Sequence, residues 1–336
     1  MKKNVAEIFL LAVAALAVLA HPALAQPVTP GGPPKQAGNS PIKVFILAGQ
    51  SNMQGQGIVT MKDKAGNEKP GTLVSMLKDP AKATLLKHLV DANGNWAEGR
   101  DDVWVYDISE QGSSHGPLKF GYGWNVGNKD WFGPELQFGH LVGNHFENQV
   151  LIIKTAWGGR DLYKDFRPPS SGGAVGPFYT QMLATVNGVL GDLKTQFPGY
   201  AGGGYELAGF VWWHGWNDFC SPKIGVPEYE QNLVNLINDV RRDLKTPKLP
   251  VVIGEFTGPW GADCKEAAAL AIRKAQKDAA ARPEFAGTVK FIETHDFVRA
   301  EKDSPTGEGY HEFKNGETYF LIGDALGKAM KELLPK

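Results

Sequence analysis

The fold that we predict for this chain rests first on the sequence VFILAGQSNM at residues 44–53. Its first five residues are continuously apolar, which is typical of a strand that a parallel sheet buries on both faces. Gly49 ends this run, and the polar pair Ser51 and Asn52 follows. Ligands of open parallel sheets bind beyond the carboxyl ends of the strands, so the turn predicts an exposed serine at that edge. A serine that only caps the next helix explains the same residues.

Five further apolar runs repeat this strand pattern along the chain. Amphipathic helix patterns lie between them, at residues 233–244 and 319–333 among others, and Pro134 and Glu135 begin one that runs toward His145. This alternation predicts an α/β fold with a parallel sheet and helices on both faces. Long insertions are expected at about 54–100, 108–131 and 160–176. The predicted strands are residues 44–48, 103–106, 150–155, 209–213, 251–254 and 289–293.

Two of these strands end in residues that suit a developing negative charge. Gly158 and Gly159 follow residues 150–155, and backbone N–H groups in such a turn approach a ligand closely, as an oxyanion hole requires. Asn217 and Asp218 follow residues 209–213. We expect the Asn217 amide to be a second donor and Asp218 to brace the loop through backbone hydrogen bonds. Ordinary Gly-Gly and Asn-Asp turns account equally well for each motif taken alone.

A histidine precedes the last helix pattern, in the sequence EGYH at residues 308–311. An acid three residues before a histidine can fold back onto its ring and fix the tautomer, as catalytic triads need. We therefore expect His311 to act as base and to titrate near neutrality, with Glu308 orienting it. Asp296, near the end of the last predicted strand, is the alternative acid. His214 is the competing base, although a packed or substrate-contacting role is favoured for it.

The four motifs follow one another in the order Ser, Gly, Asn, His and should gather at one edge of the sheet. That order resembles the SGNH hydrolase superfamily. The sequence GQSNM at residues 49–53 is similar to the sialate O-acetylesterase-like branch, which includes carbohydrate esterase family six, the acetylxylan esterases. Three positions depart from that branch: His214 replaces Gln, Trp216 replaces Glu, and Glu308 replaces Asp.

The resemblance implies a single domain over residues 42–336, a flavodoxin-like three-layer α/β/α sandwich with a parallel sheet of about five or six strands. It implies a serine esterase that removes acetyl groups from carbohydrates through an acyl-enzyme, with Ser51 as nucleophile. No metal or cofactor is expected. The oxyanion donors would be the N–H groups of Ser51 and of Gly158 or Gly159, together with the Asn217 amide. Substrate contacts are expected from Gln50, Asn52, His214 and Trp216.

Two other functions remain open from the sequence. A carbohydrate-binding protein with a decayed active site would keep the nine tryptophans of this chain and lose hydrolysis. A lipase or thioesterase of the same superfamily would need a long apolar acyl groove, which the sequence does not locate. The net charge of −1 lacks the basic footprint of a nucleic-acid binder, so no nucleic acid is expected as a partner.

The N-terminus predicts export. Lys2 and Lys3, an apolar run over about residues 8–20 and the sequence ALA at 23–25 indicate a signal peptide over residues 1–25. An uncleaved anchor is the alternative. The protein would then be secreted or periplasmic, with no membrane contact after cleavage. Residues 26–41 form a Pro/Gly-rich linker that we expect to be disordered. Cys220 and Cys264 permit one disulfide, and two free thiols fit equally well.

Overall fold

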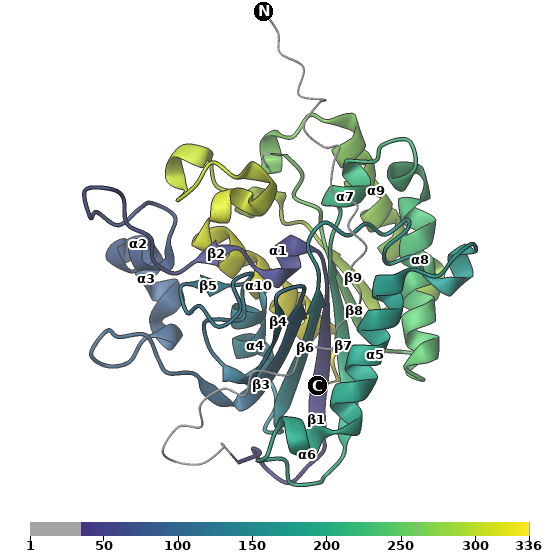
Figure 1. Cartoon of the computed structure of the whole chain (residues 1–336), viewed down its shortest axis with the longest axis horizontal. Coiled ribbons are helices and arrows are strands. Elements are labelled where there is room, and N and C mark those ends of the chain that lie inside the picture. Colours follow the sequence, from purple (N-terminus) through teal and green to yellow (C-terminus); the bar gives the residue numbers. More distant parts are fainter. Residues whose placement is uncertain (1–34, 260, 336) are drawn as a thin grey trace, which may run out of the picture.

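The computed structural model describes residues 35–259 and 261–335, and its centre is a sheet of seven strands (Figure 1). The order across the sheet is β4-β3-β6-β1-β7-β8-β9, and every neighbouring pair except β3 and β4 is parallel. All six predicted strands are present, so the predicted fold class is confirmed. The strands are β1 (Ile42–Gly49), β3 (Arg100–Ser109), β4 (Gly112–Leu118), β6 (Val150–Ala156), β7 (Tyr205–Trp213), β8 (Val251–Gly254) and β9 (Val289–Ile292).

Strand β4 has no counterpart among the predicted strands. Its sequence, GSSHGPL, contains two glycines and a proline and no apolar run, so it resembles a loop. It pairs antiparallel with β3 at the edge of the sheet, where it needs only one neighbour. A second, two-stranded sheet pairs β2 (Gly57–Ile58) with β5 (Trp131–Phe132) inside the predicted insertions.

Helices cover both faces of this sheet and complete three layers (Figure 1). In β1, Val44 and Ile46 belong to one hydrophobic core, whereas Phe45 and Leu47 belong to the other. This is the alternation of an extended strand. The first core contains residues of α5 (Pro177–Gly191), α8 (Gly225–Asp243) and α9 (Ala267–Ala280). The second contains residues of α4 (Glu135–Gly143) and α10 (Gly316–Leu333).

The central strands end at one level, which positions the candidate site. Gly49, the last residue of β1, lies opposite Ala156 of β6 and Trp213 of β7. The segments that follow the three strands therefore meet at one edge. The short helices are α1 (Ser51–Gln54), α2 (Leu73–Lys78), α3 (Pro80–Ala83), α6 (Leu193–Gln196) and α7 (Trp216–Phe219), and the 3₁₀ turns are Thr84–Leu89, Pro169–Ser171, Gly261–Asp263, Pro283–Phe285, His295–Phe297, Glu301–Asp303 and Gly309–Lys314.

The predicted signal peptide lies outside the described residues, and so does most of the predicted linker. The linker's described end, residues 35–41, contacts the domain through Gln36. Gln36 is buried, its backbone N–H donates to the Gly199 carbonyl at 3.1 Å, and its side-chain oxygen accepts from the Ala201 N–H at 2.9 Å. None of the helices in residues 35–259 and 261–335 is long and apolar enough to cross a membrane. Cys220 is exposed and Cys264 is buried, and both are free thiols.

Candidate active site

Ser51 begins α1, and only Gln50 separates it from the end of β1. The turn that carries it is tight, because a Cβ atom on Gly49 would lie 2.2 Å from the carbonyl oxygen of Trp213 in the neighbouring strand. That oxygen belongs to the backbone and has no room to move aside. Glycine at position 49 therefore lets β1 and β7 end side by side. The Ser51 side chain is half-buried at the carboxyl edge of the sheet.

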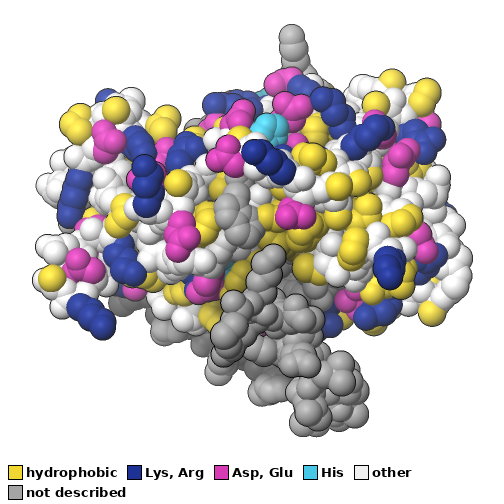
Figure 2. Space-filling view, turned by 90° about the horizontal axis from the view of Figure 1, so that it is seen from above, with side chains coloured by type: hydrophobic (Ala, Val, Ile, Leu, Met, Phe, Trp, Pro, Cys, Tyr) yellow, Lys and Arg dark blue, Asp and Glu magenta, His cyan; other side chains and the backbone are white. Residues whose placement is uncertain are grey.

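The fold brings His311 to Ser51 across 260 positions of sequence. His311 Nε2 lies 3.0 Å from Ser51 Oγ, within hydrogen-bonding distance. A serine needs a base at this distance to take its proton as it attacks a carbonyl. Figure 2 views the molecule from above, toward this edge, and shows a histidine at the surface among acidic and basic side chains. The pair has the geometry of a nucleophile and its general base.

The structure distinguishes Glu308 from the other carboxylates that lie near His311 in sequence. Glu308 Oε2 lies 3.5 Å from His311 Nδ1, which is longer than a good hydrogen bond. Catalytic hydrogen bonds are often long in the absence of substrate. Asp296 is 80% exposed and lies beside His295 instead. Glu312 turns into the core, where Thr257 and Asn52 donate to its Oε1. Glu308 is the acid that the fold places beside the His311 ring.

The pKa of His311 differs from the expected near-neutral value. Burial of the ring lowers this pKa to about 4, and Glu308 opposes the shift only in part. Lys314, which donates to Glu308 Oε1 at 2.5 Å, also disfavours a charged imidazole. His311 is therefore neutral, and able to accept a proton, well below pH 6.

The histidine loop is strained and is held by side chains from other elements. Residues 312–314 all have left-handed backbone angles, with φ of 50°, 56° and 56°. Asn52 Nδ2 donates to the Tyr310 carbonyl and to Glu312 Oε1, each at 3.3 Å. The Tyr319 hydroxyl donates to Asn52 Oδ1 at 2.6 Å. Asn52 thus connects the turn that carries the nucleophile to the loop that carries the base.

The two glycines predicted as oxyanion donors occupy different positions. A Cβ atom on Gly158 would lie 3.7 Å from Ser51 Cβ, so Gly158 adjoins the nucleophile. Its N–H donates to a carboxylate oxygen of Glu110 at 3.2 Å. Gly159 is exposed, and a Cβ atom there would have no atom within 4 Å. The Asn217 side chain is half-buried in α7 and has no hydrogen-bond partner among residues 35–259 and 261–335.

Three of the four predicted substrate contacts are buried, with polar atoms that bind the protein itself. Gln50 is buried, and its Oε1 accepts from the Gly215 N–H at 3.1 Å. Asn52 is buried, and its amide makes the hydrogen bonds to the histidine loop and to Tyr319 that are described above. His214 is buried, with Nε2 2.9 Å from the Arg160 carbonyl and Nδ1 3.2 Å from the Tyr229 hydroxyl. These residues position the site. Trp216 is half-buried and packs against Phe219 and Phe256.

Asp218 holds a loop at the carboxyl edge of the sheet through backbone hydrogen bonds, as expected. Its carboxylate accepts from the backbone N–H groups of Leu162 and Tyr163, at 2.8 Å and 3.2 Å. Because these residues follow the Gly-Gly turn, Asp218 fixes the loop after β6 to the loop after β7. The first three motifs are therefore linked to one another by buried hydrogen bonds.

A buried charge cluster behind Ser51 escaped the sequence prediction. Lys154 of β6 is fully buried, and its ammonium donates to the Gln54 carbonyl at 2.7 Å and to Glu135 Oε2 at 2.9 Å. Asp107 Oδ1 is 3.4 Å away. Burial raises the pKa of Asp107 to about 7 and also raises that of Glu135. The cluster fixes the last residue of α1, and the lone lysine inside an apolar strand was its signal in the sequence.

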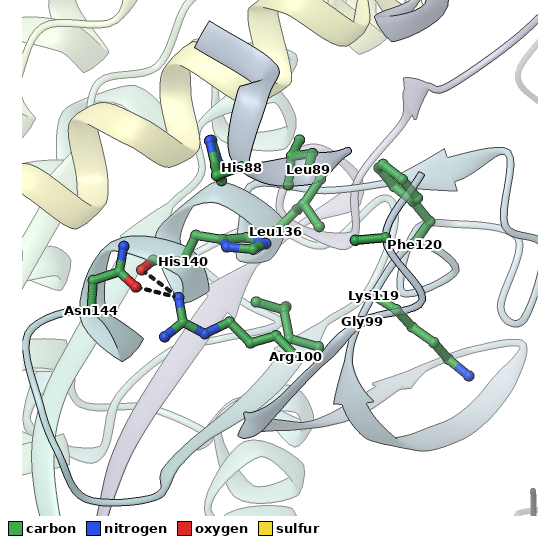
Figure 3. Close-up of a pocket in the computed structure, with 11 residues that line it drawn as sticks. His88, Leu89, Gly99, Arg100, Lys119, Phe120, Leu136, His140 and Asn144 are labelled. Carbon is green, nitrogen blue, oxygen red and sulfur yellow. Dashed lines mark hydrogen bonds between the residues drawn. The ribbon is translucent and has the colours of Figure 1, made fainter. Parts of the chain in front are cut away.

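A cavity of about 320 Å³ lies apart from these residues (Figure 3). It opens between the start of β3 and helix α4, where Arg100 donates to the His140 carbonyl and to Asn144. His88 completes a pair of histidines with His140, at a ring separation of 4.8 Å. None of the predicted site residues lines this cavity. The candidate active site is therefore separate from this cavity.

A model of a known protein family matches most of this chain. The family model described as "Carbohydrate esterase, sialic acid-specific acetylesterase" matches residues 41–306. This range covers most of the chain and contains Ser51, Gly158 and Asn217, whereas Glu308 and His311 lie outside it, within five residues of its end. A probable carbohydrate esterase from Arabidopsis thaliana is 26% identical over 230 residues, which are 67% of this chain and 74% of that protein.

Two solved structures share the fold. The X-ray structure of a protein from Arabidopsis thaliana has a TM-score of 0.52 and 17% identity, and the match covers 87% of this chain and 98% of that one. NanS has a TM-score of 0.52 and 13% identity with the same two coverages. At such identities the likeness shows the fold alone. The family match shows more: this chain belongs to the sialic acid-specific acetylesterase family of carbohydrate esterases, and it is a carboxylic ester hydrolase.

Proposed function

We propose that this protein releases acetate from O-acetylated carbohydrates through an acyl-enzyme on Ser51, and that it acts after export, as a secreted or periplasmic protein. The observation that carries the mechanism is the 3.0 Å contact between Ser51 Oγ and His311 Nε2. Two residues so distant in sequence meet in a half-buried site at the carboxyl edge of the sheet, where open α/β folds bind their ligands.

In the proposed reaction Ser51 Oγ attacks the acetyl carbonyl while His311 Nε2 takes the hydroxyl proton. The tetrahedral intermediate then expels the sugar oxygen, which receives that proton from His311. Water attacks the acetyl-serine with His311 again as base, and acetate leaves as Ser51 regains its proton. Glu308 holds the His311 ring and stabilises its charged form between these steps.

The negative charge on the acetyl oxygen needs donors beside Ser51. We assign the backbone N–H groups of Ser51 and Gly158 and the Asn217 amide to this role. Gly158 is preferred to Gly159 because it adjoins Ser51 Cβ. Loss of one donor should remove roughly 3 kcal/mol of transition-state stabilisation.

Acetate release from a panel of substrates tests the function. Acetylated xylan, acetylated sialic acid and acetylated pectin cover the acetylxylan-type and sialate-type alternatives. We expect acetate from at least one of them, and no release by the Ser51→Ala variant. Ser40→Ala is the matched control, because Ser40 is exposed and precedes the start of β1, whereas Ser51 follows its end. Wild-type protein that binds these glycans without releasing acetate would support a decayed, carbohydrate-binding protein instead.

Export is tested separately. We expect mass spectrometry of the protein from culture medium or periplasm to show Gln26 as its first residue. Exported protein that retains Met1 would indicate an anchor and would contradict this part of the proposal.

A further inference from the structure

One arginine beside the candidate active site has no partner for its charge. Seven of the eight arginines of the chain donate hydrogen bonds to carboxylates or carbonyl groups of the protein. Arg160 is the exception: within residues 35–259 and 261–335 its guanidinium forms no hydrogen bond and no salt bridge, and its Nε is buried without an acceptor. A buried N–H group without an acceptor is rare in folded proteins, which indicates that the acceptor comes from outside the chain.

Arg160 is close to the reacting atoms along the chain. It follows Gly158 by two residues, and a Cβ atom on Gly158 would lie 3.7 Å from Ser51 Cβ. Consecutive Cα atoms are about 3.8 Å apart, so the Cα atom of Arg160 lies within about 8 Å of that of Gly158. His214 Nε2, 2.9 Å from the Arg160 carbonyl oxygen, fixes the backbone at this position.

The side chain of Arg160 stays at the same edge of the sheet. Its guanidinium lies over the Phe178 ring, 4.2 Å from the ring centre. Phe178 in turn contacts Trp157, the residue before Gly158, with a ring separation of 5.3 Å. The aromatic ring covers one face of the guanidinium and leaves the N–H groups in its plane for a ligand.

The carboxylates nearest to Arg160 along the chain and beside Gly158 are engaged elsewhere. Asp161 accepts from two backbone N–H groups of its own loop, at 2.8 Å and 2.9 Å. Glu110 accepts from Gln54 Nε2 at 2.8 Å. The positive charge of Arg160 is therefore left for a ligand, and the planar fork of a guanidinium matches a carboxylate through two parallel hydrogen bonds.

We infer that Arg160 is a specificity-determining residue that binds the carboxylate of an acetylated sugar acid while the acetyl group lies at Ser51. This inference rests on the proposed function, and it decides between the sialate-type and acetylxylan-type alternatives in favour of an acidic sugar. A neutral sugar leaves the guanidinium unpaired. The carboxylate is remote from the reacting carbonyl and binds Arg160 equally well in the ground state and the transition state, so the contact should lower KM more than it raises kcat.

Two substrates that differ only in this charge test the inference. Acetylated sialic acid and its methyl ester carry the same sugar and the same acetyl group, but the methyl ester has no negative charge. We expect wild-type kcat/KM for acetate release to favour the acid at least about tenfold, mainly through KM, as a charged hydrogen-bonded pair should. Arg160→Gln should reduce this preference to below about threefold. Arg160→Lys, which keeps the charge without the planar fork, should lie between the two.

Arg282→Gln is the matched control. Arg282 pairs with Glu230 at 2.6 Å and precedes β9, whose start lies at the edge of the sheet opposite to the site. This variant should keep the wild-type preference. Salt gives a second readout that needs no variant: because ions screen charge pairs, the preference of the wild type for the acid should shrink as sodium chloride rises from about 0.05 M to about 0.5 M.

The outcomes separate the inference from the function. Equal wild-type rates with the acid and its methyl ester, a preference that salt leaves unchanged, or a folded Arg160→Gln protein that keeps the full preference overturns the inference while esterase activity stands. Release of acetate from acetylated xylan but not from acetylated sialic acid does the same. Wild-type protein that releases acetate from none of these esters defeats the proposed function instead. Melting temperatures establish that each variant is folded, and if Arg160→Gln is not, Arg160→Lys and the salt dependence decide.

Discussion

The proposed nucleophile and its base are held in opposite ways. Ser51 follows the end of β1, between β6 and β7, where regular strand geometry sets its place. His311 lies in an irregular turn whose next three residues are left-handed, at a cost of roughly 1–2 kcal/mol each. Such a turn persists only when surrounding contacts hold it. The sheet therefore positions Ser51, whereas a few side chains position His311.

This difference predicts where the site is fragile. The contacts that hold the histidine loop come from Asn52 of α1, Tyr319 of α10 and Thr257, which follows β8. Each is a single side chain. Substitutions there should misplace the base while the nucleophile stays in position, so turnover should suffer before the fold does.

The largest effect should come from removing either partner itself. We expect Ser51→Ala and His311→Asn each to lower kcat/KM for acetate release by at least about a thousandfold, because nucleophile and base act as a unit. Melting temperatures should change little, since both side chains are only partly buried. A Ser51→Ala variant that keeps a tenth of the activity would remove Ser51 from the mechanism. An active His311→Asn protein beside an inactive His214→Asn protein would transfer the role of base to His214.

The second effect tests how the base is oriented. Glu308→Gln keeps the shape of the side chain and removes its charge, so kcat should fall on the order of a hundredfold. Asp296→Asn should have little effect, because Asp296 is exposed beside His295. Stopped assays of acetate release on both variants provide the comparison. The reverse ranking would mean that Asp296 moves to His311 when substrate binds.

The same difference between the supports of Ser51 and of His311 governs what could be predicted from the sequence. Six strands and the turns that follow β1, β6 and β7 were predictable, because apolar runs and the glycines and polar residues after them are local signals. The edge strand β4 was not, since its pairing with β3 supplies what its composition lacks. Regular structure places Ser51 and Gly158 together without any knowledge of side chains.

The histidine loop was less predictable. The spacing of Glu308 and His311 suggested that they meet, but the left-handed residues at 312–314 carry no glycine to signal the turn. Gln50 and His214 looked available for substrate because they flank the motifs, whereas tertiary packing buries both. Burial also moved the His311 pKa, and sequence position alone does not report burial.

The third effect is on the pH profile. With a His311 pKa of about 4, the neutral base persists as pH falls, and activity should reach half its plateau near pH 4. An ordinary histidine, with a pKa of about 6.5, would leave only about 3% of the plateau at pH 5. We expect kcat/KM at pH 5 to remain close to the plateau. Circular dichroism at each pH separates titration from acid unfolding, and half-maximal activity near pH 6.5 would contradict the buried ring.

The fourth effect should come from removing the hydrogen bonds of the Asn52 side chain. Asn52→Leu has a similar volume but cannot bond to the Tyr310 carbonyl, Glu312 or the Tyr319 hydroxyl. Unsatisfied buried partners should lower the free energy of unfolding by about 1–3 kcal/mol. We expect kcat to fall about tenfold with a smaller change in KM, since one supporting contact of the base is lost. Asn93→Leu, on an exposed turn, is the control. A variant that loses stability but keeps kcat would show that Asn52 only supports the fold.

The smallest effect concerns the buried carboxyl next to His311. Burial raises the pKa of Glu312 to about 8, so the folded protein binds this proton more tightly than the unfolded chain does. The resulting stabilisation is complete below the unfolded pKa near 4.5 and is lost as pH rises through 8. Glu312→Gln has no proton to lose. The free energy of unfolding of the wild type, relative to this variant, should therefore decline by about 3–4 kcal/mol between pH 5 and pH 8. Asp107 and Asp218 also have raised pKa values, but both proteins contain them and they cancel in the difference. Urea unfolding at several pH values measures this difference, with Glu284→Gln, an exposed acid, as control. A difference that stays constant with pH would mean that Glu312 is ionised in the folded protein, and the loop that carries the base would then be held by charge instead of by a neutral hydrogen bond.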